Sequence, residues 1–261
     1  MSRIRGQVGI GMAKFDSYVI CTSPRSGSTL LCKMLTATGA AGQPDSYFFG
    51  TSLEGWLGDL GIAREETADE REILQAAFRA AHVKGRNGTN VFGLRMQGHS
   101  FEFFCEKLAI LHPGRLSDRE RFQHAFGTTL FLHLTRPDKV DQAVSYLKAQ
   151  QTGLWHVAPD GSELERLAPH REPRYDGEDI RACVETMSAY DRDWNDWFAR
   201  EGIEPLRISY DDLSADPIGI LRHILDRLGL DQAAADSVRP GVRKLADSTN
   251  REWVARYLSE Q

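Results

Sequence analysis

Residues 23–29, with the sequence SPRSGST, carry side chains suited to binding an anion. They follow a short apolar, β-branched run at residues 18–22, which predicts a buried strand, and they precede apolar residues at helical spacing. Backbone N–H groups at the start of a helix carry partial positive charge and bind phosphate or sulfate. Gly27 lets the backbone approach such an anion closely, and Arg25 adds a planar guanidinium that matches its oxygens.

The hydroxyl groups of Ser26, Ser28 and Thr29 add further hydrogen-bond donors to this loop. The loop differs from the GxxxxGK[ST] motif of nucleotide hydrolases, because Ser28 follows Gly27 where that motif has lysine. Magnesium and a nucleoside triphosphate are therefore poorly supported as ligands. The alternative is a polar strand-to-helix turn that binds nothing, but the arginine, the glycine and the strand–loop–helix order favour an anion site.

A second candidate pair is Arg136 and Ser145. Arg136 follows residues 128–135, which are apolar on both faces, as in a central parallel strand. Ser145 lies nine positions later on the next predicted helix, ~13 Å along its axis. The two can share one ligand only if that helix folds back past the strand end. The alternative is a surface arginine and an unrelated helical serine.

The spacing of apolar residues predicts strands at 18–22, 91–95, 128–135 and 206–210, with helices between them, including a strongly periodic one at 179–200. Strands that alternate with helices predict an α/β fold with a mostly parallel central sheet and helices on both faces. Ligands of such sheets bind at the carboxyl ends of the strands. Both candidate sites lie at such ends.

The chain has 261 residues, of which 41% are hydrophobic. This length and composition predict a single domain at residues 15–261, preceded by a flexible leader at 1–14. Residues 157–174 contain three prolines among charged residues and predict a long surface excursion that could act as a lid.

Composition also excludes several classes. The net charge of −5 argues against a nucleic-acid partner. The apolar runs fall short of the ~18 residues that a membrane span needs, and no secretory signal is present, so we expect a cytoplasmic protein without stable membrane insertion. Four cysteines without paired spacing predict reduced thiols. No His, Cys or Asp cluster has the spacing of metal ligands, so no metal is expected.

The two candidate sites resemble elements of the sulfotransferase superfamily, and the closer resemblance is to the bacterial trehalose 2-sulfotransferase family. The residues that carry it run in order along the chain: SPRSGSTLL at 23–31, ATGAAGQP at 37–44, RPD at 136–138 with QAVS at 142–145, QT at 151–152 with Trp155, and EWV at 252–254. The resemblance covers the chain from about residue 15 to its end.

This resemblance implies a P-loop NTPase-like three-layer fold and a PAPS-dependent transfer of a sulfuryl group to a hydroxyl. PAPS, 3′-phosphoadenosine-5′-phosphosulfate, is the donor co-substrate. Residues 25–29 match the 5′-phosphosulfate loop, and Arg136 and Ser145 match the 3′-phosphate element. Tyr210, in the sequence YDDL, matches a tyrosine that contacts adenine, although it could equally pack at a strand end.

The resemblance also points to a carbohydrate or glycolipid-type acceptor, or another small molecule, and it allows a homodimer. Arg243 and Lys244 resemble a basic segment that covers the 3′-phosphate, or they form a solvated pair. Four aromatic residues could stack on a sugar ring or belong to the core: Phe48, Phe49, Trp56 and Trp155.

One departure from the trehalose family concerns the catalytic base. Counted from Pro44, the family's proposed glutamate base falls on Ser46, which has no carboxylate. Asp45 beside it and His99 after the second strand are the candidate bases, with a turn residue and a helix cap as their structural alternatives. The departure leaves the acceptor open.

In the predicted mechanism, Arg25 and the amides of residues 27–29 stabilise the charge on the leaving phosphate. The competing functions are a P-loop-like small-molecule kinase, which would depend on magnesium, and a catalytically impaired protein that binds PAP, the desulfated donor.

Overall fold

The computed structural model describes residues 13–63, 69–157, 160–239 and 248–261. Most of the expected leader at 1–14 lies outside the described residues. Arg243 and Lys244, expected near the 3′-phosphate, also lie outside them.

A parallel sheet forms the centre of the described structure, with the strand order β2-β1-β3-β6. Its strands are β1 (Ser17–Thr22), β2 (Phe92–Gln97), β3 (Thr129–Thr135) and β6 (Leu206–Ser209). Ile20 of β1 lies opposite Arg95 of β2 and Leu132 of β3, and every pairing in this sheet is parallel. The carboxyl ends of the strands therefore meet at one edge, with the loop after β1 between two neighbouring strands.

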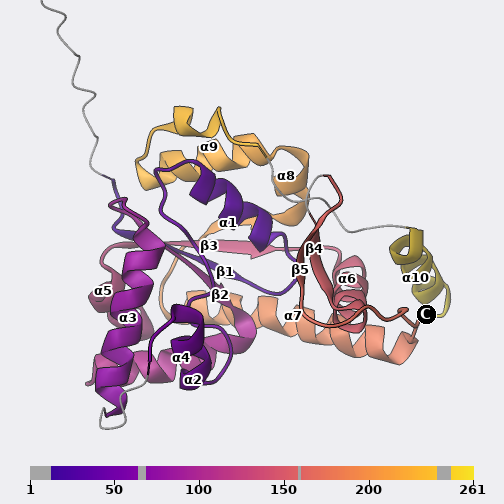
Figure 1. The fold of residues 1–261 in the computed structure, drawn as a ribbon, viewed down its shortest axis with the longest axis horizontal. Coiled ribbons are helices and arrows are strands. Elements are labelled where there is room, and N and C mark those ends of the chain that lie inside the picture. The colour runs from indigo at the N-terminus through magenta and orange to yellow at the C-terminus, as the bar shows by residue number, and fades with distance from the viewer. Residues whose placement is uncertain (1–12, 64–68, 158–159, 240–247) are drawn as a thin grey trace, which may run out of the picture.

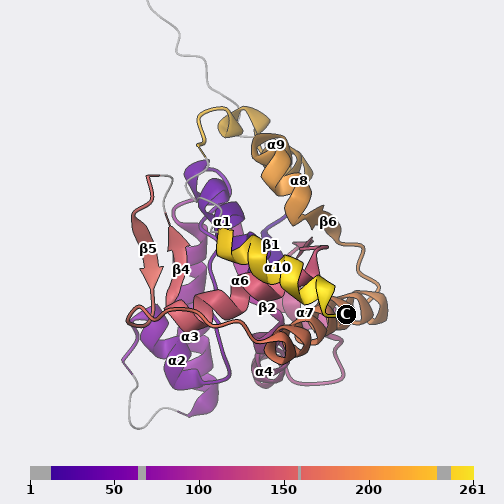
Figure 2. The same ribbon diagram turned by 90° about the vertical axis from the view of Figure 1, so that its right-hand side faces the viewer.

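Helices cover both faces of this sheet, as Figures 1 and 2 show. On one face lie α1 (Ser28–Ala37), α8 (Tyr210–Ala215) and α9 (Pro217–Leu228). On the other lie α2 (Leu53–Leu60), α3 (Glu70–Arg86), α4 (Gly98–Leu111), α5 (Asp118–Phe126) and α7 (Gly177–Arg200). The predicted three-layer α/β fold with a mostly parallel sheet is confirmed.

A third group of elements lies beside the carboxyl edge of the sheet. Helices α6 (Lys139–Thr152) and α10 (Ser248–Ser259) pack with α7 in a separate apolar cluster. In Figure 2, α10 crosses in front of α6. Strands β4 (Leu154–Val157) and β5 (Glu163–Arg166) form a small antiparallel sheet, so part of the expected excursion at 157–174 is a hairpin arm. A short 3₁₀ helix, η1 (Gln232–Ala235), follows α9.

The strand residues divide between the two faces as their alternation requires. Val19 and Cys21 of β1 face the core on the side of α3, α4 and α7, whereas Tyr18 and Ile20 face the core on the side of α1 and α9. All four side chains are fully buried. A strand buried on both sides has no polar face, which explains why residues 18–22 form a continuous apolar run. No helix among the described residues combines the length and the apolar character that crossing a membrane requires.

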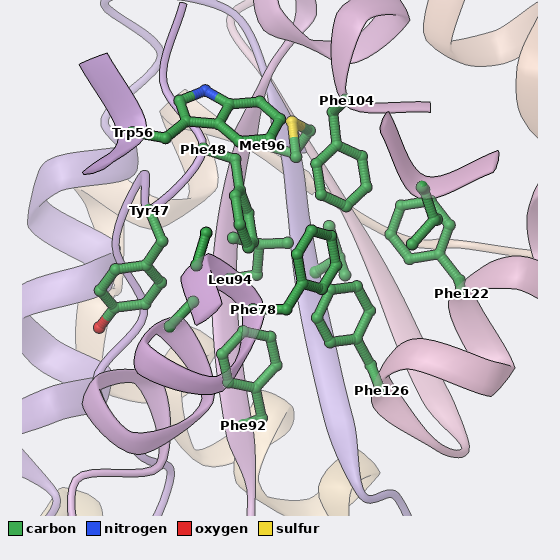
Figure 3. Packing of buried hydrophobic residues seen from close by; sticks show 14 of the residues in the cluster. Tyr47, Phe48, Trp56, Phe78, Phe92, Leu94, Met96, Phe104, Phe122 and Phe126 are labelled. Atoms are coloured by element: carbon green, nitrogen blue, oxygen red, sulfur yellow. The ribbon is translucent and has the colours of Figure 1, made fainter. Parts of the chain in front are cut away.

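Aromatic side chains dominate the core beneath β2 (Figure 3). Phe104 of α4 is fully buried, and its ring centre lies 5.1 Å from that of Phe48 and 5.4 Å from that of Phe122. Trp56 is also fully buried and packs edge-on against Phe48. Phe48 and Trp56 are therefore core residues and cannot stack on a sugar, whereas Phe49 is half exposed.

We expect Phe104→Ala to lower the free energy of unfolding by about 3–5 kcal/mol, because it leaves a large cavity among packed rings. Phe49→Ala is the matched control, and its exposed ring should cost less than about 1 kcal/mol. Urea denaturation followed by tryptophan fluorescence measures both. Equal losses in the two variants would contradict the assignment of Phe104 to the core.

Candidate functional site

A cavity of about 1300 Å³ opens at the carboxyl edge of the parallel sheet. Eight of the residues singled out in the sequence line it: Arg25, Gly27, Ser28, Thr29, Asp45, His99, Arg136 and Ser145. Tyr210 lines it as well, but it begins α8 and does not end a strand. Ser26, a residue of the same loop, is fully buried.

The loop between β1 and α1 has an unusual backbone. Arg25 has a φ of 63° and Gly27 a φ of 87°, both in the left-handed region. A left-handed arginine is sterically costly and persists only where its surroundings hold it. Gly27 is the N-cap of α1, and it has no side chain to accept from the first amides of the helix. The start of α1 therefore faces the cavity without a side-chain cap.

Buried hydrogen bonds hold this loop against the sheet. The Ser26 hydroxyl bonds to Thr22 Oγ1 at 2.5 Å, and Thr22 Oγ1 donates to the Leu134 carbonyl of β3 at 2.8 Å. Trp194 of α7 donates its indole N–H to the Thr22 carbonyl at 3.1 Å. The Ser26 side chain thus fixes the loop and does not point into the cavity.

A second anchor comes from α6. Gln142 is fully buried, and its Nε2 donates to Ser23 Oγ at 3.0 Å and to the Pro24 carbonyl at 2.7 Å. Lys139 donates to Gln142 Oε1 at 3.1 Å and to Asp191 of α7 at 2.5 Å. These bonds fix α6 relative to the loop.

Arg25 links the loop to two other elements. Its Nε donates to Ser145 Oγ of α6 at 3.1 Å, and its Nη1 donates to the Trp155 carbonyl of β4 at 2.6 Å. Helix α6 therefore passes beside the loop, as the sequence required if Ser145 was to join Arg136 at one site. Trp155 lines the same cavity.

Arg136 is buried directly behind this loop. Its Nη1 donates to the Arg25 carbonyl at 3.1 Å, its Nη2 pairs with Asp141, and its guanidinium lies 4.5 Å from the ring centre of Tyr210. The Tyr210 ring also rests against Gly27, where a Cβ atom would lie 2.7 Å from it. The arginine, the tyrosine and the glycine therefore form one packed unit.

These residues create a local positive potential in a chain of net charge −5. Burial, and then the nearby Arg136, lower the pKa of Arg25 to about 10, so Arg25 stays protonated at neutral pH. Two neighbouring guanidinium groups that repel each other are stabilised by an anion placed beside them. The site therefore fits a phosphate- or sulfate-bearing ligand.

Arg95, which the sequence analysis did not select, connects the loop to the segment of the candidate bases. From β2, its Nε donates to Ser46 Oγ at 2.8 Å and its Nη1 to Thr29 Oγ1 at 3.0 Å. Its Nη2 forms an ion pair with Asp45 at 3.0 Å, and the Asp45 side chain is 57% exposed. In the sequence, the available signal for Arg95 was the presence of an arginine at the carboxyl end of an otherwise apolar predicted strand.

His99, the other candidate base, lies near the start of α4. Its ring packs edge-on against Phe49, with centres 4.9 Å apart, and its centre lies 6.4 Å from that of Tyr190. Burial lowers its pKa. His99 also lines the cavity.

His156 of β4 is a second residue that the sequence analysis missed. Its Nε2 lies 3.1 Å from Thr29 Oγ1 and 3.4 Å from Glu165 of β5. Burial, and then the charges of Arg25, Arg95 and Lys33, lower its pKa to about 3. In the sequence, the available signal for His156 was its position next to Trp155, which belongs to one of the stretches that resemble the trehalose 2-sulfotransferase family.

Among the described residues, no cluster of three His, Cys, Asp or Glu side chains could hold a metal ion.

The arrangement combines a helix start without a side-chain cap, the two neighbouring guanidinium groups of Arg25 and Arg136, and titratable side chains around one cavity. Such a site can bind a charged group at the loop, stabilise negative charge that develops there, and move a proton nearby. It therefore has the parts that a group-transfer enzyme for phosphate- or sulfate-bearing substrates requires.

The sequence model of the Stf0 sulphotransferase family matches residues 17–260, and the chain belongs to this family. It is therefore a sulfotransferase by family. The chain is 32% identical to trehalose 2-sulfotransferase of Mycobacterium tuberculosis (strain ATCC 35801 / TMC 107 / Erdman), over 93% of this chain and 94% of the relative. It is 28% identical to trehalose 2-sulfotransferase of Mycolicibacterium smegmatis (strain ATCC 700084 / mc(2)155), over 92% and 94%.

Among solved structures, a sulfotransferase from Alicyclobacillus acidocaldarius aligns with a TM-score of 0.44 at 16% identity, over 95% of this chain and 93% of that one. A score this low adds nothing to the family assignment.

We expect Gly27→Ala to destabilise the loop for two separable reasons. A left-handed alanine costs about 1–2 kcal/mol, and the clash of its Cβ with the Tyr210 ring should add about 1–3 kcal/mol. Gly39→Ala is the matched control, because Gly39 has a φ of 65° but no atom within 4 Å of an added Cβ. Denaturant unfolding measures both, and equal losses would show that the contact with Tyr210 is unimportant.

Proposed function

We propose that this protein transfers a sulfuryl group from PAPS to a hydroxyl of a carbohydrate or glycolipid-type acceptor. The observation that carries the proposal is the hydrogen bond between Arg25 and Ser145, 3.1 Å long, at the cavity wall. It joins the 5′-phosphosulfate loop to the helix of the 3′-phosphate element, so one nucleotide with both groups can contact the two together. Family membership and the trehalose 2-sulfotransferase relatives support the same activity.

The residues divide between the two charged ends of the donor. Arg25 and the amides of Gly27, Ser28 and Thr29 hold the 5′-phosphosulfate and stabilise the charge that develops on the leaving phosphate. Ser26 contributes through its backbone, since its hydroxyl is bonded to Thr22.

The nucleoside end of the donor contacts Arg136, Ser145 and Tyr210. Arg136 and Ser145 bind the 3′-phosphate, and Tyr210 packs against the adenine. Because ATP has no 3′-phosphate, this contact selects PAPS over ATP and argues against the kinase alternative.

The rest of the cavity suits an acceptor with ring faces and hydroxyl groups. Phe49 and Trp155 line it and offer aromatic surface for a sugar ring. Gln97, at the carboxyl end of β2, also lines it, and its buried Oε1 has no hydrogen-bond partner among the described residues. An acceptor hydroxyl that donates to Gln97 would remove the cost of this unpaired oxygen. Trehalose is the first acceptor to test, because the relatives are named for it.

We expect PAP to bind more tightly than ADP in calorimetry without magnesium, because only PAP carries a 3′-phosphate. The measurement is repeated with magnesium, which should leave this order unchanged. Tighter binding of ADP that depends on magnesium would instead support a kinase, and the absence of binding by either nucleotide would contradict the donor site.

We expect Arg136→Ala to weaken PAP binding by about 2–4 kcal/mol, because it removes a buried charge that contacts the 3′-phosphate. ADP binding serves as the internal control, since a general collapse of the loop would weaken both ligands equally. Arg222→Ala on α9, a half-exposed arginine paired with Asp236, should change neither affinity. Unchanged PAP affinity in Arg136→Ala would exclude Arg136 from the site.

A further inference from the structure

The proposed reaction requires a group that accepts the proton of the acceptor hydroxyl, and the obvious carboxylates are poorly arranged for this. Ser46 stands where the resemblance places a glutamate, and its hydroxyl accepts a hydrogen bond from Arg95. The neighbouring Asp45 is paired with the same guanidinium. The Oδ1 atom of Asp45 already accepts hydrogen bonds from Arg95 and from the amide of Ser46.

His156 has the position that this role requires. It lines the cavity, and its Nε2 lies 3.1 Å from the hydroxyl of Thr29 in the first turn of α1. A sulfuryl group carried by the loop would therefore lie close to the imidazole. The ring projects from β4, whose Trp155 carbonyl binds Arg25, so the loop and His156 are held in one arrangement. An imidazole can take one proton and release it later at neutral pH.

We propose that His156 is the general base of the sulfuryl transfer and that binding of the donor anion activates it. This inference rests on the proposed function. The O–H bond of the acceptor breaks and its proton passes to the unprotonated nitrogen of His156. The acceptor oxygen forms a bond to the donor sulfur, while the bond from sulfur to the bridging oxygen breaks and its electron pair remains on the 5′-phosphate of PAP.

The charges around His156 explain why the donor activates it. Arg25 from the loop, Lys33 from α1 and Arg95 from β2 surround the ring with positive charge, and Glu165 from β5 opposes them. Together with burial, these cations hold the pKa at about 3 in the free protein, so the ring is neutral but a weak base. Phosphate and sulfate oxygens bound at Arg25 and Thr29 offset this positive charge and favour the protonated ring. The pKa of His156 must therefore rise when the donor binds.

Glu165 completes the arrangement. Once His156 has taken the proton, its imidazolium lies beside the Glu165 carboxylate, 3.4 Å from Nε2, and is stabilised by it. The protonated ring of His156 is therefore formed next to the carboxylate of Glu165. The ring of His99 instead packs against the aromatic rings of Phe49 and Tyr190.

The first test follows the His156 ring by NMR, with the signal assigned by comparison with His156→Gln. We expect PAP to raise its pKa by about 1–3 pH units, and we expect Glu165→Gln to reduce the bound pKa. Binding of PAP with an unchanged His156 pKa would overturn the activation while leaving the proposed function intact. A failure of the wild-type protein to bind PAP would instead overturn the proposed function.

The second test measures transfer of labelled sulfate from PAPS to trehalose, or to water if trehalose is not accepted. We expect His156→Gln to lower kcat by about 100- to 10,000-fold with PAP affinity nearly unchanged. The wild-type kcat should fall as the pH drops through the pKa of the bound His156, because a protonated ring cannot accept a proton. His156→Gln should lose this acidic limb.

The rival bases are tested in parallel as Asp45→Asn and His99→Gln. Both should retain the acidic limb at the same pH as the wild type, whatever their effect on the affinity for the acceptor. If His156→Gln keeps the limb while either of these variants loses it, the base is the other residue and our assignment is wrong.

Discussion

The site depends on keeping positively charged groups close together in a mostly buried loop. Arg25 occupies a left-handed backbone conformation that is unfavourable for arginine, and Arg136 lies immediately behind it. Neither feature would persist in an isolated loop. Hydrogen bonds from Gln142 and Trp194 and within the sheet hold the backbone of the loop, and Arg136 donates to the Arg25 carbonyl. The fold therefore maintains a positive electrostatic potential at the loop, and this potential favours the binding of an anion.

This constraint explains why three separate elements of the structure contact the same loop. Helix α6 brings Ser145, strand β4 brings the Trp155 carbonyl and His156, and β2 brings Arg95. Each supplies an acceptor or a partner to a group on the loop, since buried polar groups must be hydrogen-bonded. The aromatic core beneath β2 gives that strand a rigid base, because close-packed rings resist displacement, whereas α6 packs with α7 and α10 in a separate cluster. Binding chemistry and packing are thus inseparable at this edge of the sheet.

The contacts of Ser46, where the resemblance places a glutamate, have consequences for the whole site. Arg95 binds the serine, the neighbouring Asp45 and Thr29, so the segment that would carry the base is tied to the anion loop. His156 contacts the same hydroxyl of Thr29. In this protein the proton-accepting position and the anion loop are connected through a single hydroxyl. This connection makes the protonation of His156 sensitive to what the loop binds.

Much of the fold could be predicted from the sequence, because buried parallel strands leave a continuous apolar run. Residues 128–135 and 18–22 predicted β3 and β1 to within one residue, and Asp216 followed by Pro217 predicted the start of α9. The anion loop was also predictable, since its chemistry depends on a short local order of strand, glycine and helix. These features are local, so neighbouring residues specify them. The strand predicted at 206–210 ends one residue earlier, because the side chain of Ser209 caps a helix that begins at Tyr210.

Only the tertiary structure decided which distant residues meet the loop. The local signals at Arg95 and His156 could not show what these residues contact, because their contacts with Thr29 join residues 66 and 127 positions apart in the chain. The same holds for the four aromatic residues: Phe48 and Trp56 turned inward to the core, while Phe49 and Trp155 line the cavity. Composition fixes how much aromatic surface the chain has, but packing of distant elements decides which side chains are buried. The sequence by itself therefore determined the sheet and the chemistry of its anion loop, and the folded structure decided what surrounds that loop.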